Sequence, residues 1–442
     1  MDKDTKGAPM WGEQTALAVR NFPISGERMP RPIIEMIAMI KAEAAHVNVE
    51  LKVMNKEMGG AIQLAANEIV SGQMADQFPI DVFQTGSGTS TNMNVNEVIA
   101  HRASELCGIA VHPNDHVNAS QSSNDVFPSS IRIAALRLLV GELLPALVAL
   151  ATSLRELSER HRTTVKLSRT HLMDALPMTF GQEAGGWARG VELGVERLSG
   201  VLHRLGELPL GGTAVGTGLN APAGFGALIV ERLRARTGLS LAVAHDRFEA
   251  QSSQDVLVEL SGLLKTVALT LHKIAGDLRL LSSGPDGGLA EIELPSLQAG
   301  SSIMPGKVNP VIPEVVQQVA AQVVGNDATI TFAATLSTLQ LNTAMPVMAR
   351  SLMSSLTLLS TSVAQLDSRC IRGIEVHKER MRQLAEGSSA LVTVLAPLVG
   401  YDAATELVKD ARSSGQGIAE MARTMHIQGL DDLDVLSLAL PS

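Results

Sequence analysis

The chain has 442 residues, of which 45% are hydrophobic but only 2% aromatic, so its core has to be built from aliphatic side chains and methionine, which pack well along helices. The formal net charge of −9 and the absence of a basic run argue against nucleic-acid binding. The two cysteines, Cys107 and Cys370, are too few for a disulfide framework or a Cys/His metal site, so we expect no metal.

The N-terminal segment, MDKDTKGAPMW, is polar and lacks the apolar core of a signal peptide. No uncharged apolar run approaches the roughly 18 residues of a transmembrane helix. We therefore expect a soluble cytoplasmic protein with no membrane partner, long enough for two or three domains.

The first two helices are expected within residues 31–72, where apolar residues recur at helical spacing and Gly59–Gly60 mark the break between them. A small turn with two hydroxyl side chains follows at Ser87, Gly88 and Thr89. The run of Asn and Thr after this turn is typical of turns and helix caps and by itself indicates no site.

Two polar clusters come next in the chain. The first consists of His112, Pro113, Asn114 and Asp115, and the second of Ser122, Ser123 and Asn124. The second cluster directly precedes a long apolar-periodic stretch, which predicts a helix N-cap. Free N–H groups at a helix N-terminus bind carboxylates for the same reason that they bind phosphates, so a cap and an anion site are compatible here.

Long helices are expected from about residue 128 onwards. Their predicted ranges are 128–161, 179–208, 221–238, 248–283, 313–337 and 346–377. Helices of this length with apolar faces and few charges are typical of a bundle whose outer faces are buried against other subunits, so we expect an oligomer. After residue 377 the helices shorten and indicate a small C-terminal domain.

Two loops between these helices carry reactive side chains. Thr170 and His171 lie in the first, although a lone loop histidine is more often a surface residue than a catalyst. The second loop, residues 300–310, reads GSSIMPGKVNP, and its glycines and prolines exclude a helix interior or a central strand.

The loop at 300–310 combines a possible base, a cation and an amide. Lys307, Asn309 and freed backbone N–H groups could hold an oxyanion while a serine oxygen removes a proton. A glycine- and proline-rich connector of no function is the alternative. A phosphate-binding loop is excluded, because the glycine spacing is one residue too long and Val308 stands where Ser or Thr is needed.

This loop resembles the signature of the fumarase/aspartase superfamily, G-S-S-x-M-P-x-K-x-N, and every fixed position of that signature is present. The resemblance runs from Trp11 to about Asp410. Arg-Thr-His at 169–171 is similar to class II fumarases, whereas aspartases carry Arg-Thr-Gln. The chain departs from the family at Ser168, where glycine is usual, and at Asp286, where a basic residue is common.

The resemblance implies an all-α, three-domain fold with a central long-helix bundle that forms a multi-helix core in a homotetramer. The domains are expected at residues 1–127, 128–377 and 378–442. It further implies that the protein interconverts (S)-malate and fumarate plus water, that its substrate is a small C4 dicarboxylate, and that it uses neither a metal nor an organic cofactor.

The family pattern also implies roles for single residues. Ser301 would remove the proton at carbon, through an aci-carboxylate intermediate stabilised by Lys307, and His171, polarised by Glu314, would handle the proton of the hydroxyl group or water. The residues expected to bind substrate are Ser87, Gly88, Thr89, Ser122, Ser123, Asn124, Thr170, Ser302, Val308 and Asn309. A second, nearby anion site is expected at His112, Pro113, Asn114 and Asp115.

Other readings of the same motifs stay open. An aspartase-like ammonia-lyase, or a lyase for another succinyl-type substrate, would use a similar loop, although His171 speaks against aspartase. A catalytically silent paralogue is a third reading, and the presence of all the expected chemical residues speaks against it.

The spacing of the motifs predicts that active sites are shared between subunits. A helix of roughly 34 residues, about 50 Å long at about 1.5 Å per residue, separates Asn124 from His171. A C4 dicarboxylate is much shorter than that. If both residues contact one substrate molecule, they have to come from different chains of a symmetric oligomer.

Overall fold

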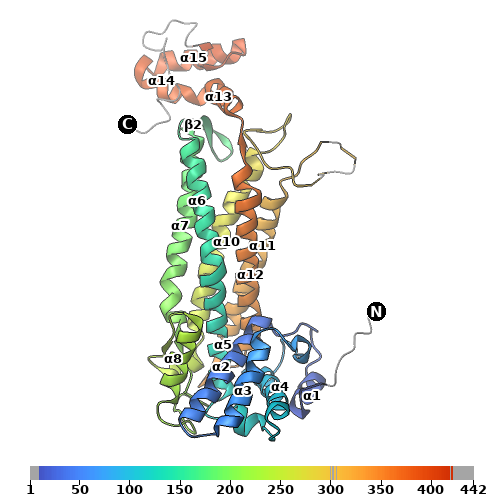
Figure 1. The fold of residues 1–442 in the computed structure, drawn as a ribbon. Helices are drawn as coiled ribbons and strands as arrows, with labels where there is room; N and C mark the ends of the chain where they lie inside the picture. The colour runs from blue at the N-terminus through green and yellow to red at the C-terminus, as the bar shows by residue number, and fades with distance from the viewer. Residues whose placement is uncertain (1–8, 299, 301–302, 305, 419, 422–442) are drawn as a thin grey trace. The chain divides into compact units, whose positions relative to one another are not determined.

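A computed structural model describes residues 9–298, 300, 303–304, 306–418 and 420–421 of the chain. Most of these residues are helical, and the strands form two-stranded ladders rather than a large sheet, which confirms the all-α prediction (Figure 1). The shortest ladders pair β3 (Glu207–Leu208) with β4 (Ala242–Val243), β5 (Ile292–Glu293) with β8 (Glu375–Val376), and β6 (Ser337–Thr338) with β7 (Leu341–Asn342).

The chain divides into two compact units, and several long helices contribute residues to both. The first unit contains the residues up to 145 together with 196–268 and 321–360. The second contains 146–195, 269–320 and the residues from 361 onwards. The three-domain division with boundaries at 127 and 377 stays a prediction.

The N-terminal part of the first unit is a cluster of helices around α2. The helices are α1 (Glu13–Asn21), α2 (Arg31–Glu50), α3 (Lys56–Val70), α4 (Thr89–Cys107), α5 (Ser123–Leu138) and α8 (Phe225–Thr237). Helix α2 contacts α3, α4, α5 and α8, so it is covered on several sides. Its aliphatic side chains, such as Ile33, Ile37 and Ile40, are completely buried.

The break between α2 and α3 is not where the glycines predicted it. Helix α3 begins after Asn55, whose side-chain oxygen accepts a hydrogen bond from the N–H of Met58 at 2.9 Å. Gly59 and Gly60 lie inside α3, so the prediction that they separate the helices is wrong. A Cβ at Gly59 would come within 2.2 Å of the Val49 side chain, so this glycine allows α3 to approach α2 closely.

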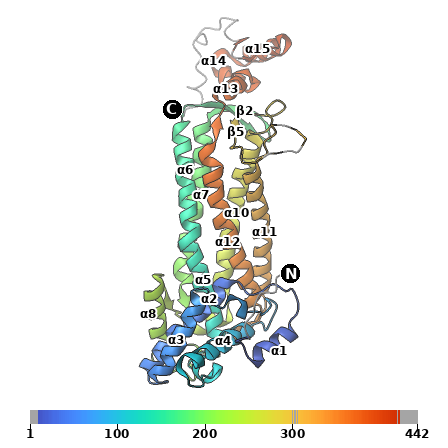
Figure 2. The same cartoon turned by 45° about the vertical axis from the view of Figure 1, so that its right-hand side comes forward.

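The long helices begin and end close to the predicted residues, except that the last of them ends at Arg369 and not at 377. They are α6 (Leu144–Arg160), α7 (Phe180–Leu205), α10 (Asp255–Leu281), α11 (Val311–Ala334) and α12 (Met345–Arg369), and within each unit their segments lie side by side (Figures 1 and 2). The predicted helix at 128–161 begins earlier, at Ser123, and consists of α5, one π-helical turn and α6. The predicted helix at 248–283 is divided into α9 (Arg247–Ser252) and α10, because Ser253 has an extended backbone.

The second unit contains a hairpin that the sequence did not predict. Strand β1 (Val165–Thr170) pairs antiparallel with β2 (Met173–Thr179). Leu167 of β1 is buried together with Leu395 and Leu407 of the C-terminal helices. These helices are α13 (Lys378–Gly387), α14 (Val392–Val399) and α15 (Tyr401–Ser414), so the helices do shorten after residue 377 as predicted.

One helical stretch, Ser123–Arg160, is long and apolar enough to cross a membrane by length and composition, with a mean hydropathy of 2.0 over its most apolar window. The core helices of water-soluble proteins pass the same test. Arg137 lies within this stretch and pairs with Glu35 of α2 at 3.3 Å. The stretch is therefore weak evidence for a membrane span.

Candidate active site

The N-terminus of α5 has the cap that the sequence predicted. Ser122 is the N-cap residue, and its side-chain oxygen accepts a hydrogen bond from the N–H of Asn124 at 3.2 Å. In return, the Asp125 carboxylate accepts a hydrogen bond from the N–H of Ser122 at 2.9 Å. This reciprocal capping box fixes the first turn of α5 and leaves the side chains of Ser123 and Asn124 half-buried.

The N-terminus of α4 converges on the N-terminus of α5. Gly88 precedes α4 with φ of +75°, and a Cβ at this position would come within 2.3 Å of the Phe127 ring. The Thr89 hydroxyl lies 2.7 Å from the Ser87 hydroxyl and 2.8 Å from the Ser123 hydroxyl. A chain of three hydroxyl groups therefore links the starts of the two helices.

Two converging helix N-termini are well suited to bind a carboxylate. Both helix dipoles have their positive ends here, and the hydroxyl groups can donate hydrogen bonds to an anion. We call the set Ser87, Thr89, Ser122, Ser123 and Asn124 the hydroxyl cradle. The structure thus brings together five of the residues that the sequence predicted to bind substrate.

A glycine-rich segment supports the cradle from a distant part of the sequence. Asp125 accepts hydrogen bonds from the backbone N–H groups of Gly211 at 3.1 Å and Thr213 at 2.9 Å. The Asn124 side chain donates to the carbonyl oxygen of Ala214 at 2.9 Å. Gly211, Thr213 and Ala214 all lie in the loop between β3 and α8, so this one loop holds the first turn of α5 in place.

Two charged residues near the cradle, Lys41 of α2 and Asp125 of α5, are completely buried. Burial raises the pKa of Asp125 to about 6, while its backbone hydrogen bonds and the Lys41 charge oppose that rise. Burial lowers the pKa of Lys41 to about 7, against the attraction of Asp125. Sequence reasoning missed Lys41, although a lysine within the apolar run IIEMIAMIKAEAA could have pointed to it.

The predicted second anion site lies in a π-helical turn, Pro113–Val117. His112 precedes the turn, and its Nδ1 atom lies 3.2 Å from the Asp115 carboxylate. His112, Asn114 and Asp115 are exposed, and Pro113 is half-buried. The carboxylate of Asp115 already occupies one side of the imidazole, and the binding of an anion here stays a prediction.

The hairpin β1–β2 carries Thr170 and His171 at its tip. His171 and Leu172 form the turn with positive φ angles of 57° and 63°, and both side chains are exposed, as is Thr170. Within the described part of the chain, the His171 side chain has no hydrogen-bond partner. The histidine is therefore presented to its surroundings by the turn rather than held by neighbours.

The base of this hairpin is held by buried charges. Lys166 pairs with Glu183 at 2.6 Å and with Glu291 at 3.3 Å, and Arg169 pairs with Glu291 at 2.9 Å. Glu291 is completely buried, and Lys166 is 2% exposed. Since Arg169 precedes Thr170 directly, this network fixes the strand that leads to His171.

The signature loop is described in part, and Ser301 and Ser302 lie outside the described residues. The N–H of Gly300 donates to the carbonyl oxygen of Lys307 at 2.9 Å, and the Asn309 side chain donates to the Gly300 carbonyl oxygen at 2.9 Å. A Cβ at Gly300 would come within 2.3 Å of the Lys307 carbonyl oxygen, so only glycine fits this close approach. The ends of the loop are thereby tied together.

The side chains at the C-terminal end of the signature loop differ in exposure. Lys307 and Val308 are exposed, and Asn309 is half-buried. Glu314 lies in the first turn of α11, where the helix dipole favours a carboxylate. His171 and Glu314 make no hydrogen bond or ion pair with each other in the described chain, so their pairing stays a prediction.

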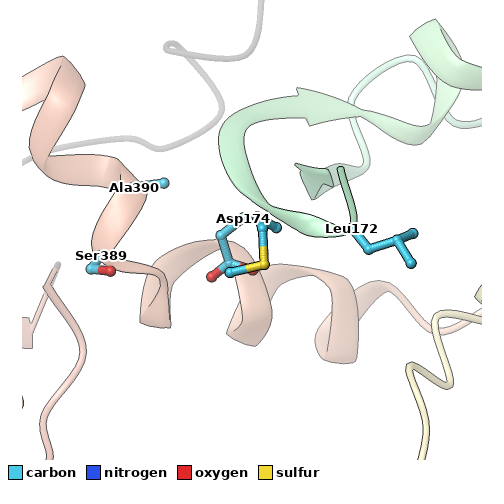
Figure 3. Close-up of a pocket in the computed structure, with 5 residues that line it drawn as sticks. Leu172, Asp174, Ser389 and Ala390 are labelled. Atoms are coloured by element: carbon cyan, nitrogen blue, oxygen red, sulfur yellow. The ribbon is translucent and has the colours of Figure 1, made fainter. Parts of the chain in front are cut away.

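A shallow pocket of about 400 Å³ lies beside the hairpin turn, and Figure 3 shows its lining. It is lined by Leu172, Met173, Asp174, Ser389 and Ala390. The Asp174 carboxylate accepts a hydrogen bond from the Ser388 hydroxyl at 2.8 Å. A lining with two large apolar side chains and a carboxylate does not suit a dianionic ligand, so the hydroxyl cradle is the better candidate for the substrate site.

Comparison with known proteins places the chain in a family. A family model described as Lyase matches residues 2–325. The chain is 50% identical to the class II fumarate hydratase of Mycobacterium tuberculosis over 439 residues, covering 97% of this chain and 92% of that protein. It is 48% identical to the class II fumarate hydratase of Corynebacterium glutamicum, covering 93% of this chain and 87% of that protein.

The fold leads to the same family. The crystal structure of a class II fumarase from Schistosoma mansoni is similar with a TM-score of 0.93 at 36% sequence identity, covering 100% of this chain and 97% of that one. Sequence and fold therefore agree over nearly the whole chain. The chain belongs to the lyase family and, within it, to the class II fumarate hydratases.

Proposed function

We propose that this protein is a fumarate hydratase that interconverts (S)-malate and fumarate plus water, a step of the tricarboxylic acid cycle, in the cytoplasm. The observation that carries the proposal is the hydroxyl cradle, where two helix N-termini and linked hydroxyl groups are ready to bind a carboxylate. Membership of the class II fumarate hydratases supports the C4 dicarboxylate as the substrate.

The chemistry requires stabilisation of a difficult carbanion. Removal of water from malate begins with loss of a weakly acidic C–H proton next to a carboxylate, and that carboxylate takes up the negative charge. We assign Ser301 as the base, and Lys307, Asn309 and Ser302 as the groups that hold the charged carboxylate. Neither a metal nor an organic cofactor takes part in this proposal.

The remaining residues orient the substrate and move the second proton. The hydroxyl cradle and Thr170 hold the substrate, and His171, paired with Glu314, exchanges a proton with the hydroxyl group or water. In the described chain Asn309 already donates to the Gly300 carbonyl oxygen, which holds its amide at the mouth of the signature loop. The His171 side chain has no partner among the described residues, which supports a partner supplied by a second subunit.

We further propose a homotetramer whose active sites combine residues from different subunits. The helical run from Ser123 to Arg160 has 38 residues, which is about 57 Å at about 1.5 Å per residue. Asn124 lies at the start of this run and His171 follows its end, so we assign the two residues of one active site to different chains. Antiparallel packing of helices in a symmetric oligomer would bring the two residues together.

The decisive assay offers malate, fumarate and aspartate to the purified protein. We expect absorbance changes from malate and fumarate, no ammonia from aspartate, and no effect of a metal chelator. Ammonia release at a rate comparable to malate dehydration would favour an aspartase-like enzyme. No turnover of any of the three by a correctly folded oligomer would favour a silent paralogue.

Shared sites are tested by complementation between Asn124→Ala and His171→Ala. Each variant alone should keep only a small fraction of wild-type activity. After mixing in denaturant and refolding, roughly one site in four should combine an intact Asn124 with an intact His171 under random assortment. Mixed oligomers that form, as shown by their mass, and remain inactive would refute sharing.

A further inference from the structure

A buried cation connects the two helices of the hydroxyl cradle, and the proposed chemistry gives it no role. The Lys41 ammonium of α2 donates to the Oδ1 atom of Asn118 at 2.7 Å. Asn118 Oδ1 also accepts from the side chains of Asn92 at 3.2 Å and Asn96 at 3.3 Å, both in α4. The Asn118 amide in turn donates to the carbonyl oxygen of Gln121 at 3.2 Å, directly before Ser122.

This arrangement differs from that of the other deeply buried lysine. Lys166 contacts two carboxylates, Glu183 and Glu291. In the described part of the chain, Lys41 has no carboxylate within ion-pair distance, and its contact is a neutral amide. A buried ammonium without a direct counter-ion is costly, so its charge calls for an explanation.

The explanation lies in Asp125. Its carboxylate is needed to fix the first turn of α5, where it accepts three backbone hydrogen bonds. However, a buried negative charge next to the cradle repels a dicarboxylate, and this repulsion is only weakly screened inside the protein. Without a positive charge nearby, Asp125 would therefore weaken the binding of an anion in the cradle that it helps to build.

We propose that Lys41 is a positioning residue of the substrate site, whose buried charge offsets that of Asp125 and keeps the hydroxyl cradle attractive to a dicarboxylate. The inference rests on the proposed function for the class of ligand. The hydrogen bonds through Asn118 give Lys41 a second task, because they join the start of α4 to the turn before α5.

The electrostatics of the region support this role. Asp125 is the charged group whose attraction opposes the lowering of the Lys41 pKa to about 7. Asn118, which accepts a hydrogen bond from the ammonium, is neutral, as are Asn92 and Asn96, which donate to the same oxygen. A dianion bound in the cradle would favour the charged form of Lys41 further.

The test measures binding of succinate, a C4 dicarboxylate that has no hydroxyl group to eliminate, by calorimetry on the intact oligomer. Lys41→Met keeps the length of the side chain and removes the charge. At pH 6.5 we expect the dissociation constant of succinate to rise about tenfold or more, the order expected for a buried charge near the ligand. For malate, KM should rise more than kcat falls.

Asn48→Leu is the matched control. Asn48 lies on the same helix, is completely buried, and bonds to the same turn through Ala119 at 3.0 Å and Ser120 at 2.7 Å, but it is neutral. We expect this variant to melt earlier while its succinate affinity stays within about threefold of wild type. Equal weakening of succinate binding by both variants would mean that Lys41 acts only through structure, and would overturn the proposal.

A double-mutant cycle isolates the charge. In the background of Asp125→Asn, the penalty of Lys41→Met on succinate binding should shrink, because the attraction of Asp125, which favours the charged form of Lys41, is gone. An unchanged penalty in that background overturns the proposal. So does a dissociation constant of Lys41→Met within twofold of wild type.

The wild-type protein provides a measurement that needs no variant. Its affinity for succinate should fall as the pH rises through about 7, where Lys41 loses its proton, and Lys41→Met should lack this dependence. A flat wild-type profile between pH 6.5 and 8.5 would contradict the proposal. An inactive wild type that binds succinate with this dependence would instead refute the proposed function and leave the role of Lys41 standing.

Discussion

The hydroxyl cradle and the hairpin turn are both expected to touch the substrate, yet they are built in opposite ways. In the cradle, the Thr89 hydroxyl bonds to those of Ser87 and Ser123, and the capping box fixes the start of α5. At the hairpin turn, Thr170 and His171 are exposed. The hydroxyl groups of the cradle are held in place before any ligand arrives, whereas the turn presents an exposed histidine that has no partner in the described chain.

The signature loop resembles the hairpin turn in this respect. Lys307 is exposed, while the backbone around Gly300 is tied by hydrogen bonds. In both segments, hydrogen bonds or ion pairs hold the backbone close to an exposed, titratable side chain. The difference from the cradle predicts that substitutions at the tips lower kcat and leave stability unchanged, whereas substitutions in the cradle raise KM and lower stability.

The largest effect is expected from the signature loop. Ser301→Ala should lower kcat by about 10³-fold or more, because the base at carbon is lost, and Lys307→Met should act similarly by removing the cation from the developing charge. Turnover is followed as fumarate absorbance. Ser282→Ala, a serine that bonds to its own helix end, is the control and should behave as wild type. Near-normal turnover of Ser301→Ala would remove this residue from the chemistry.

The second effect concerns the hairpin turn. His171→Gln should lower kcat about 10²-fold, the order of one proton-transfer group, with an unchanged melting temperature because the side chain has no partner in the described chain. His203→Gln, an exposed histidine near the end of α7, is the matched control. A clear drop in melting temperature would show that His171 is structural, and the contrast with the cradle would fail.

A smaller effect is expected from the cradle. Ser123→Ala should raise KM for fumarate about tenfold and lower the free energy of unfolding by about 1 kcal/mol, because the hydrogen bond to Thr89 is lost. Ser129→Ala, which removes a hydroxyl that bonds within α5, should leave KM unchanged. If Ser123→Ala changed kcat alone, the cradle would not be the binding half of the site.

The smallest effect is expected beside His171. Leu172 has a φ of 63°, which asparagine tolerates better than leucine, and its side chain is 73% exposed. Leu172→Asn should therefore raise the free energy of unfolding by about 0.5 kcal/mol, with kcat and KM within twofold of wild type. Chemical denaturation measures the free energy of unfolding, and steady-state kinetics measure kcat and KM. A loss of stability would show that the open turn depends on its leucine.

Much of the helical architecture followed from the sequence alone. The ends of α7, α11 and α12 lie close to the predicted ones, apart from the C-terminal end of α12, because apolar periodicity and breaker residues act locally. The prediction that Gly59–Gly60 end a helix failed because the role of these glycines depends on contacts with another helix. Whether a glycine ends a helix or allows a neighbour to approach depends on Val49, which belongs to the preceding helix.

The same division holds within the candidate site. The sequence by itself determined the capping box, since Ser122 and Asp125 lie within one helical turn, and it determined which chemical groups each motif carries. Only the tertiary structure decided that Thr89 meets Ser123, 34 residues away, and that Lys41 meets Asn118, 77 residues away. Such contacts depend on how helices pack, and packing also buries Lys41 and Asp125 and thereby shifts their pKa values, which no local pattern encodes.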